Sequence, residues 1–356
     1  MNILIMKVQT IGDTLLIEPL ISNLFLNFSK PKITLLLNEG TKEVLENHPG
    51  ISKIIEYKRE SQRDLSRISR FIKSLKLLQE LRQFNFDVVI DLDEGDRGAL
   101  ITKTLRARIS IGSSKISSRF LRSAYTNFIP DNRQHTVLRN LSPLKILGLL
   151  NISKKLKIYW KKQDEEFIRS NFSFEKNFVH IHPFSRGFFK DIEKDLLIDI
   201  INYCYEKLDL EVLVTLSYNQ REIEVKNYIE KHCANKIHFN NFRLSLPQIA
   251  CLNKSAKFFI GSDTAIMHIS AANSVPVIAF FGPTSPVVWG PWDNENEGNG
   301  YVDGLGIQKN GIHTVISNIN YNCLPCQKNG CNNSLSSECL EKLDFEVIKK
   351  QLDLFK

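Results

Sequence analysis

The sequence of 356 residues contains no uninterrupted apolar run of about 18 residues, the length that a membrane-spanning helix needs. Its first residues, MNILIMKVQTIGD, have neither the basic start nor the small-residue cleavage site of a signal peptide, and they fit a first strand better. Basic residues interleaved with aromatics, as in nucleic-acid-binding motifs, are also missing. We therefore expect a cytoplasmic protein, and nucleic acid is the partner that the sequence favours least.

Composition and length limit the class of protein further. Apolar residues make up 42% and charged residues 24% of the chain, values of a folded globular protein that exclude disordered and fibrous classes. The length suffices for two domains, and we place their boundary in the polar, basic stretch 151–165, which gives domains 1–160 and 161–356. The net charge of +8 suits an anionic partner, whether a nucleotide, a phosphorylated glycan, a membrane surface or a nucleic acid.

The most informative stretch is 258–292, FFIGSDTAIMHISAANSVPVIAFFGPTSPVVWGPW. Two apolar runs, the first stopped by Gly261, predict buried strands, and helical spacing between them predicts a connecting helix. Such a unit points the helix N-terminus, whose free N–H groups favour an anion, at the carboxyl edge of a parallel sheet. Asp263 and Thr264 either cap this helix or border an anion site, and His268 is either a core residue or part of that site.

The N-terminal half opens with the same alternation of strand and helix. A strand over 2–8 precedes a loop with Asp13, and an apolar helix is predicted over 15–28. Asp13 either caps that helix or faces a ligand at the edge of the sheet. Because strands and helices alternate in both halves, the sequence predicts an α/β protein with two doubly wound domains.

A cationic loop follows the first strand of the second half, predicted over 177–181. It contains Ser185, Arg186 and Lys190. These groups suit a diphosphate, because arginine offers a planar fork of donors and lysine a point charge. A basic loop that binds no ligand is the alternative.

Two other charged patterns can each be interpreted as part of a functional site or as a feature with no role in binding. A basic helix predicted over 59–82 is either a solvated surface or a face that meets phosphates on an acceptor; its arginines are Arg63, Arg67 and Arg70. Asp91 and Asp93 are similar to the D-x-D pair that holds a divalent metal in one class of glycosyltransferases. Two carboxylates at a strand end also occur by chance, or cap the following helix.

The C-terminal part holds a Gly- and Asn-rich stretch and four closely spaced cysteines. We predict a loop over 293–314. The cysteines permit a structural zinc site, but only the first pair has the usual ligand spacing, and a reducing cytoplasm favours free thiols. The four are Cys323, Cys326, Cys331 and Cys339.

Several of these motifs together resemble glycosyltransferase family 9, the heptosyltransferases of lipopolysaccharide. The run GSDTAIMHISAA with PVIAFFGPT matches the nucleotide-binding motif of that family, and His182-Pro183-Phe184-Ser185-Arg186 with Lys190 matches its phosphate loop. Gly12-Asp13 with Pro19-Leu20 matches its N-terminal motif. GDRGAL and HTVLRNL are closest to the core heptosyltransferase III subgroup. The resemblance covers nearly the whole chain.

This resemblance implies the GT-B fold, two Rossmann-like domains facing across a cleft, with roles for particular residues. Asp13 is implied as the catalytic base. The implied nucleotide-binding residues include Glu222 for the ribose and Leu246 near the base; the others are Ser185, Arg186, Lys190, Asp263, Thr264, Ala265 and His268. The implied acceptor-binding residues are Arg63, Arg67, Arg70, Asp96 and Arg97. Two departures leave loop shapes open: the usual Trp-Pro after Lys190 and the glycines before Glu222 are missing.

The implied reaction is inverting transfer of a heptose from ADP-heptose to a sugar hydroxyl of the lipopolysaccharide or lipooligosaccharide inner core. We expect no divalent metal or other cofactor, no nucleic-acid partner, a monomer, and a position at the inner face of the cytoplasmic membrane. A sugar-nucleotide epimerase of the same architecture is one alternative. A nucleotide- or polyanion-binding module is another, motivated by the net charge.

Overall fold

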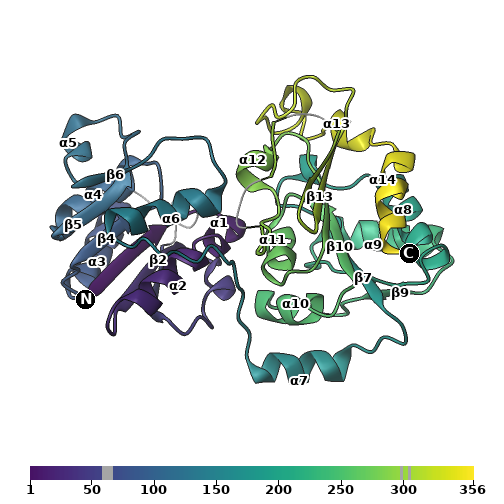
Figure 1. Ribbon diagram of the computed structural model, residues 1–356, viewed down its shortest axis with the longest axis horizontal. Coiled ribbons are helices and arrows are strands. Elements are labelled where there is room, and N and C mark those ends of the chain that lie inside the picture. The colour runs from purple at the N-terminus through teal and green to yellow at the C-terminus, as the bar shows by residue number, and fades with distance from the viewer. Residues whose placement is uncertain (58–66, 297–299, 304–305) are drawn as a thin grey trace. The chain divides into compact units, whose positions relative to one another are not determined.

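The computed structural model describes residues 1–57, 67–296, 300–303 and 306–356 (Figure 1). Contacts divide the chain into an N-terminal unit, Met1–Lys154, and a C-terminal unit, Lys155–Lys356. Each unit has its own sheet and its own apolar core. Within the described ranges, no helix combines the length and hydropathy needed to cross a bilayer.

The N-terminal unit is built on a six-stranded sheet in the order β3-β2-β1-β4-β5-β6, in which every neighbouring pair is parallel. Its strands are β1 (Asn2–Lys7), β2 (Lys32–Asn38), β3 (Ile51–Tyr57), β4 (Val88–Asp91), β5 (Ile109–Ser113) and β6 (Asn127–Ile129). Its helices are α1 (Ile11–Leu15), α2 (Glu18–Asn27), α3 (Arg67–Arg82), α4 (Asp96–Leu105), α5 (Arg119–Arg122) and α6 (Thr136–Ile146).

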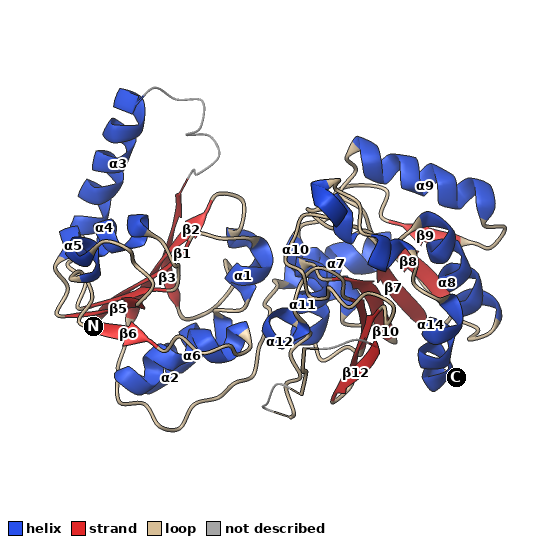
Figure 2. Cartoon of the chain, turned by 90° about the horizontal axis from the view of Figure 1, so that it is seen from above, coloured by secondary structure: helices blue, strands red, loops and turns tan. Residues whose placement is uncertain are grey.

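Helices on both sides explain why the central strands of this sheet are almost wholly apolar. α3 and α4 lie over one face, and α2 and α6 lie over the other (Figure 2). A parallel sheet covered in this way is buried on both faces, so its strands read as continuous apolar runs. Lys7 is the exception in β1, and it is only 6% exposed.

The order of the strands fixes where a ligand can bind. The chain grows outward from β1 through β2 and β3 on one side, and through β4, β5 and β6 on the other. The crevice at such a reversal, beyond the carboxyl ends of the strands, is the usual ligand site of this fold. Helix α1, which follows β1, carries Asp13 to that edge, and the loop after β4 carries Asp93 there.

The single helix predicted over 15–28 is wrong, because the structure has two. α1 ends at Leu15, and α2 begins at Glu18 with Pro19 in its first turn. Proline lacks the N–H that a continuous helix would need at this position, but it fits the first turn of a new helix. Of the helix predicted over 59–82, the structure describes the part from Arg67.

The C-terminal unit is built on a seven-stranded sheet in the order β12-β13-β11-β10-β7-β8-β9, parallel except for the pair β12 and β13. Its strands are β7 (Phe178–His182), β8 (Glu211–Val214), β9 (Ile237–Phe239), β10 (Phe258–Ser262), β11 (Val277–Phe280), β12 (Gly306–Asn310) and β13 (His313–Ser317). Its helices are α7 (Lys162–Asn171), α8 (Lys194–Glu206), α9 (Gln220–His232), α10 (Leu246–Asn253), α11 (Ala265–Ala272), α12 (Pro286–Trp289), α13 (Glu338–Glu341) and α14 (Phe345–Leu352).

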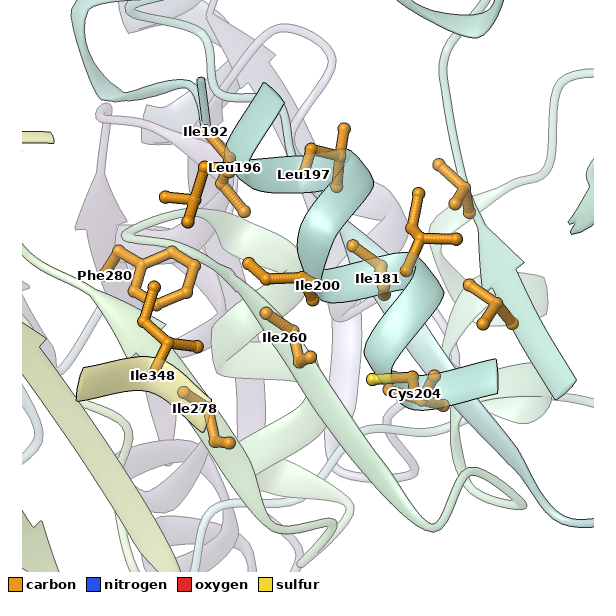
Figure 3. Packing of buried hydrophobic residues seen from close by; sticks show 14 of the residues in the cluster. Ile181, Ile192, Leu196, Leu197, Ile200, Cys204, Ile260, Ile278, Phe280 and Ile348 are labelled. Carbon is orange, nitrogen blue, oxygen red and sulfur yellow. The ribbon is translucent and has the colours of Figure 1, made fainter. Parts of the chain in front are cut away.

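The core of this unit lies between its sheet and helices α8 and α14. Leu197, Ile200 and Cys204 recur at helical spacing on α8, and all three are fully buried in one cluster with Ile181 of β7 and Ile260 of β10 (Figure 3). Burying one such aliphatic side chain contributes about 1.5 to 3 kcal/mol. This packing holds β7 and β10 side by side, and the strand order reverses between them.

The loop predicted over 293–314 is wrong in its second half. β12 and β13 form an antiparallel hairpin in which Asn310 pairs with His313, and Gly311 in the turn has a φ of +56°. The two residues of the turn are Gly311 and Ile312, and two-residue hairpin turns favour glycine at a central position with positive φ. The hairpin extends the sheet beside β11.

Candidate functional site

In the C-terminal unit, Lys190 and Asp263 join the loop after β7 to the loop after β10. The Lys190 ammonium donates to the main-chain oxygen of Asp263 at 2.9 Å and to its carboxylate at 3.0 Å. Both side chains are largely buried. Because β7 and β10 are the strands at which the order reverses, this pair lies where an α/β sheet binds its ligand.

The N-terminus of α11 begins directly after Asp263. Thr264 is the N-cap, its hydroxyl accepting from the main-chain N–H of Met267 at 3.4 Å, and Ala265 is the first helical residue. His268, one turn on, is buried. The unpaired N–H groups and the dipole of this helix end favour an anion, in the same place as the Lys190 ammonium.

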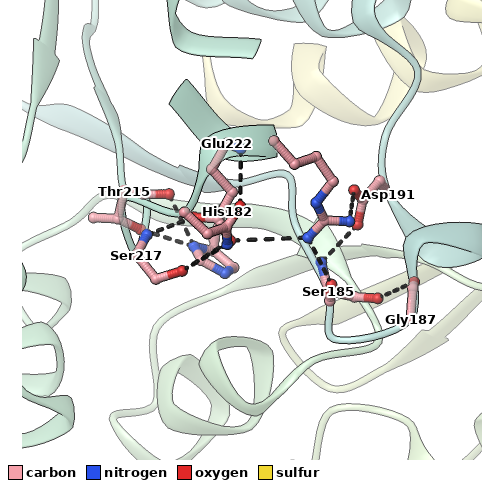
Figure 4. Close-up of polar contacts among 9 residues, drawn as sticks. His182, Ser185, Gly187, Asp191, Thr215, Ser217 and Glu222 are labelled. Carbon is pink, nitrogen blue, oxygen red and sulfur yellow. Dashed lines mark hydrogen bonds and ion pairs between the residues drawn. The ribbon is translucent and has the colours of Figure 1, made fainter. Parts of the chain in front are cut away.

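A polar clasp, formed by Arg221, Asp191 and Ser185, holds the loop that contains Lys190 (Figure 4). Arg221 forms an ion pair with Asp191 and donates through Nη2 to the main-chain oxygen of Ser185 at 2.9 Å. Asp191 also accepts from the main-chain N–H of Ser185 at 2.7 Å, and the Ser185 hydroxyl donates to the Gly187 oxygen at 2.5 Å. Burial raises the pKa of the Asp191 carboxyl to about 6. The clasp therefore sets the loop shape without the missing Trp-Pro.

Glu222 organises the neighbouring turn, between β8 and α9. Its carboxylate accepts from the Ser217 main-chain N–H and hydroxyl, the latter at 2.8 Å, and from the Asn219 amide at 2.6 Å. Tyr218 has a φ of +63°, a conformation that glycine adopts more readily, and its hydroxyl donates to the Asn240 main-chain oxygen. These contacts hold the turn in which the family usually has glycines.

Two histidines on β7, the buried His180 and the partly buried His182, contact Thr215 of the adjacent segment. His182 Nδ1 donates to the Thr215 main-chain oxygen at 3.0 Å, so its Nε2 is left as an acceptor, and the ring is neutral because burial lowers its pKa to about 4. His180 lies between the Thr215 hydroxyl and the amide of Asn253, and burial lowers its pKa to about 3. Both histidines belong to β7, the strand that leads into the loop with Ser185 and Lys190.

Two more nucleotide-binding residues were predicted in this unit, Arg186 and Leu246. The first lies in a surface loop and the second at the start of a helix. Arg186 is exposed in the loop between Ser185 and Lys190. Leu246 is half-buried as the first residue of α10, behind the N-cap Ser245, whose hydroxyl accepts from the Gln248 N–H.

In the N-terminal unit, Asp13 completes the cap of α1 and contacts a buried lysine. Its Oδ2 accepts from the Thr10 hydroxyl at 2.7 Å and from the Thr10 main-chain N–H at 3.3 Å. Its Oδ1 lies 3.6 Å from the ammonium of Lys7, which also donates to the Leu92 oxygen at 3.3 Å. Asp13 is not the N-cap predicted for a helix over 15–28. Thr10 is the N-cap of α1, and Asp13, the third residue of α1, completes its capping box while its Oδ1 lies on the Lys7 side.

Asp91 and Asp93 make their contacts within the N-terminal unit. Asp91 is fully buried and accepts from the Tyr125 hydroxyl at 2.5 Å and from the Asp93 N–H at 3.0 Å. Burial, with the neighbouring Asp93 charge, raises its pKa to about 7. Asp93 accepts from the Val8 N–H at 2.8 Å. Within the described ranges, no three His, Cys, Asp or Glu side chains are grouped as metal ligands.

The predicted acceptor residues are described in part. Asp96 and Arg97 are exposed in the first turn of α4, and the Arg97 guanidinium lies over the ring of Tyr57 at 4.9 Å. Arg63 lies outside the described residues. Arg67 and Arg70 belong to the first turn of α3, of which only the backbone is described at these positions.

The seven cysteines are free thiols in this structure. Cys323 is exposed, Cys326 and Cys331 are partly exposed, and Cys339 is buried in the core of the C-terminal unit. Burial raises the pKa of the Cys339 thiol to about 12, which makes it unreactive as a nucleophile.

Two Rossmann-like units, one of which sets a lysine and a helix N-terminus together at its strand-order reversal, are the architecture of a GT-B protein. Residues 74–335 match glycosyltransferase family 9 (heptosyltransferase), and the chain belongs to this family. It is therefore a heptosyltransferase-family enzyme, which favours transfer over epimerisation as its class of activity.

Named proteins similar to this chain agree with that assignment. It is 28% identical over 291 residues to lipopolysaccharide heptosyltransferase 3 of Escherichia coli, covering 80% of this chain and 84% of that protein. Lipopolysaccharide heptosyltransferase 1 of Campylobacter coli is 23% identical, with coverages of 80% and 84%.

Solved structures show the same fold. A family 9 glycosyltransferase from Veillonella parvula superposes with a TM-score of 0.76 at 16% identity, covering 99% of this chain and 96% of that one. The E. coli heptosyltransferase WaaC with ADP-2-deoxy-2-fluoro heptose gives 0.72 at 18% identity and covers 100% of both chains.

Sequence reasoning missed three residues that shape the sites: Arg221, Asp191 and Lys7. The first two form the clasp on the phosphate loop, and the third pairs with Asp13. Lys7 could have been noticed as the one charged residue in an apolar strand. The clasp had no local signal, because its two members are thirty positions apart.

Proposed function

We propose that this protein transfers a heptose from ADP-heptose to a sugar hydroxyl of the lipopolysaccharide inner core, with inversion at the anomeric carbon. Support comes from relatives named lipopolysaccharide heptosyltransferases and from a fold shared with WaaC, whose structure holds an ADP-heptose analogue. The observation that carries the proposal is the Lys190–Asp263 contact in front of α11.

The leaving ADP is held by donors around that contact. Lys190 has three N–H donors, and two contacts with Asp263 leave one for a phosphate oxygen. Arg186 and the N–H groups at Ala265 add further donors, and the Ser185 hydroxyl joins them only by leaving the Gly187 oxygen to which it donates here. A hydrogen bond to a charged group contributes about 1.5 to 3 kcal/mol. Negative charge grows on the diphosphate as the sugar leaves, so these donors stabilise the transition state more than the intact donor.

The nucleoside is assigned to the edge formed by Glu222, Leu246 and His268. A carboxylate can accept about four hydrogen bonds, so Glu222 can take a ribose hydroxyl beside its contacts with Ser217 and Asn219. Backbone groups at Leu246 meet the base, and His268 and Thr264 complete the helix end.

Asp13 is the proposed general base, removing the proton from the acceptor hydroxyl. Lys7 orients its carboxylate through Oδ1, while Thr10 holds Oδ2. A general base of this kind is worth about a hundred- to ten-thousand-fold in rate. The acceptor is assigned to Asp96, Arg97 and the basic stretch 59–82. Its anionic groups are assigned to Arg97 and to the arginines of that stretch, Arg63, Arg67 and Arg70, and its hydroxyls to the Asp96 carboxylate, which accepts hydrogen bonds.

The reaction is proposed to run without a divalent metal, as a monomer, at the inner face of the cytoplasmic membrane. Cationic and N–H donors replace the metal at the diphosphate. Asp91 and Asp93, the alternative metal ligands, have their described contacts with Tyr125 and main-chain N–H groups.

Mass spectrometry tests the proposal directly. Purified protein is incubated with ADP-heptose and a core oligosaccharide, and we expect the acceptor to gain the mass of one heptose. Turnover of ADP-heptose without any acceptor would instead identify an epimerase, and would overturn the proposal. Core oligosaccharides from cells with and without the protein then locate the added sugar.

A further inference from the structure

Residues 97–130 contain seven lysines and arginines and no aspartate or glutamate. Together with Asp96, the first residue of α4, this stretch forms α4, β5, α5 and the edge strand β6 of the N-terminal unit. Figures 1 and 2 both show α5 beside α4. Charge of one sign over such a stretch creates a surface that attracts anions.

Exposed apolar side chains are interspersed with these cations. Phe120 is 67% exposed, Leu100 is 51% exposed and Phe128 is 37% exposed. Lys103 follows Leu100 by three residues on α4, so both lie on one face of that helix. With Arg119 and Arg122 of α5, they form a surface that we call the α4–β6 patch: Leu100, Lys103, Arg119, Phe120, Arg122 and Phe128.

Contacts within the patch tie its cations to its rings. The Lys103 ammonium lies 3.7 Å from the centre of the Phe120 ring and donates to the Phe120 oxygen at 2.6 Å. The Arg122 guanidinium lies 5.0 Å from the centre of the Phe128 ring. The cations are thus fixed beside the apolar groups instead of extending away from them.

We propose that the α4–β6 patch docks the protein on an anionic lipid bilayer. Exposed phenylalanine and leucine next to lysine and arginine suit the bilayer interface, where rings enter the headgroup region and cations meet lipid phosphates. This docking proposal rests on the proposed function in one respect: the lipopolysaccharide acceptor of that function lies at a membrane.

Two other occupants fit the patch less well. A second copy pairing through the same patch would bring like charges together. Single-stranded nucleic acid needs open ring faces for base stacking, but a cation already lies over each phenylalanine ring, and Leu100 cannot stack. A bilayer uses both the charge and the apolar surface.

Vesicle co-sedimentation tests the proposal with the full chain. The probe is vesicles of phosphatidylcholine with and without phosphatidylglycerol. We expect binding only with phosphatidylglycerol, and weaker binding at high salt. Arg119→Glu combined with Arg122→Glu should weaken binding by at least about 25-fold, since each cation near an anionic bilayer is worth about fivefold. Phe120→Ser should weaken it by about three- to tenfold, and this loss should persist at high salt.

The matched control reverses two exposed cations elsewhere, Lys162→Glu with Lys231→Glu. It changes the net charge equally and should bind as the unaltered protein does. Equal losses in both double variants, or no binding by the unaltered protein, would overturn the proposal. The proposal would also be overturned if the Arg119→Glu/Arg122→Glu variant lost binding to single-stranded RNA while its vesicle binding stayed unchanged.

Activity separates this inference from the proposed function. On a soluble, delipidated core oligosaccharide, the Arg119→Glu/Arg122→Glu variant should transfer heptose at the rate of the unaltered protein. If neither protein transfers heptose while vesicle binding depends on the patch, the proposed function fails and the docking surface stands.

Discussion

Arg221 binds Asp191 across the loop that carries Lys190, and the same guanidinium donates to the Ser185 main-chain oxygen. It also lies over the Phe188 ring, 4.2 Å from the ring centre. One side chain thus holds three points of the loop. Lysine cannot reproduce this arrangement, because it has no planar fork to bind a carboxylate and a carbonyl together.

This clasp makes donor affinity dependent on pH. The Asp191 pKa is raised to about 6, so below pH 6 the carboxylate takes up a proton and its charged pair with Arg221 is lost. The unaltered protein should bind ADP-heptose more weakly at pH 5 than at pH 7.5, measured by calorimetry without acceptor. Asp191→Asn should remove this dependence, and an unchanged pH profile in that variant would contradict the role of the clasp.

The same carboxyl affects stability in the opposite direction. Its pKa in the folded protein is above the unfolded value near 4, so the folded state binds the proton more tightly. The contribution of Asp191 to the free energy of unfolding is therefore full below about pH 4 and is lost as the pH rises to about 6. Urea unfolding of the unaltered protein and of Asp191→Asn across that window measures it.

Lys190→Ala should weaken ADP binding by about ten- to a hundredfold, the worth of one charge-assisted hydrogen bond. It also leaves the Asp263 carboxylate without its ion-pair partner, close to the diphosphate. Titration calorimetry with ADP measures the effect. Lys194→Ala, in the first turn of α8, is the matched control and should bind normally. Unchanged affinity in Lys190→Ala would place the diphosphate elsewhere.

Asp13→Asn should lower turnover by at least about a hundredfold and leave the affinity for ADP unchanged. The amide keeps an oxygen for the cap of α1 but cannot accept the proton of the acceptor hydroxyl. Turnover is measured by release of ADP, and a thermal melt checks that the cap survives. Turnover near the original rate would remove Asp13 from the chemistry.

Heptose transfer should persist in EDTA, because lysine, arginine and N–H donors are assigned to the leaving diphosphate. Initial rates with and without chelator give the result. Loss of activity with recovery on addition of magnesium or manganese would revive Asp91 and Asp93 as ligands.

Gly98→Ala should destabilise the N-terminal unit. A Cβ at this position in α4 would lie 1.9 Å from Oδ2 of the buried Asp91, which already accepts from Tyr125. Overpacking of this kind costs about 1 to 3 kcal/mol. Urea unfolding measures the loss, with Gly95→Ala as the control, because a Cβ there has no atom within 4 Å.

Local sequence patterns predicted most of the features that belong to a single strand or helix. Apolar runs marked β7 and β10, and helical spacing marked α11, so the predicted site residues Lys190 and Asp263 were placed after the right strands. The periodicity of a strand or helix depends on neighbours a few residues away, and a sequence records this directly. The break before Pro19 and the hairpin turn at Gly311 were equally local, but their signals were overlooked.

By itself, then, the sequence determined two α/β units, the order of their elements and the loops that carry Asp13 and Lys190. Only the tertiary structure decided that Arg221 clasps Asp191, that Asp91 is buried against Tyr125, and that Lys7 meets Asp13. Each of these pairs joins side chains from different elements. For the first two pairs, the distance depends on which strands lie side by side, and no local spacing encodes that. For Lys7 and Asp13, it depends on how the chain turns between β1 and α1.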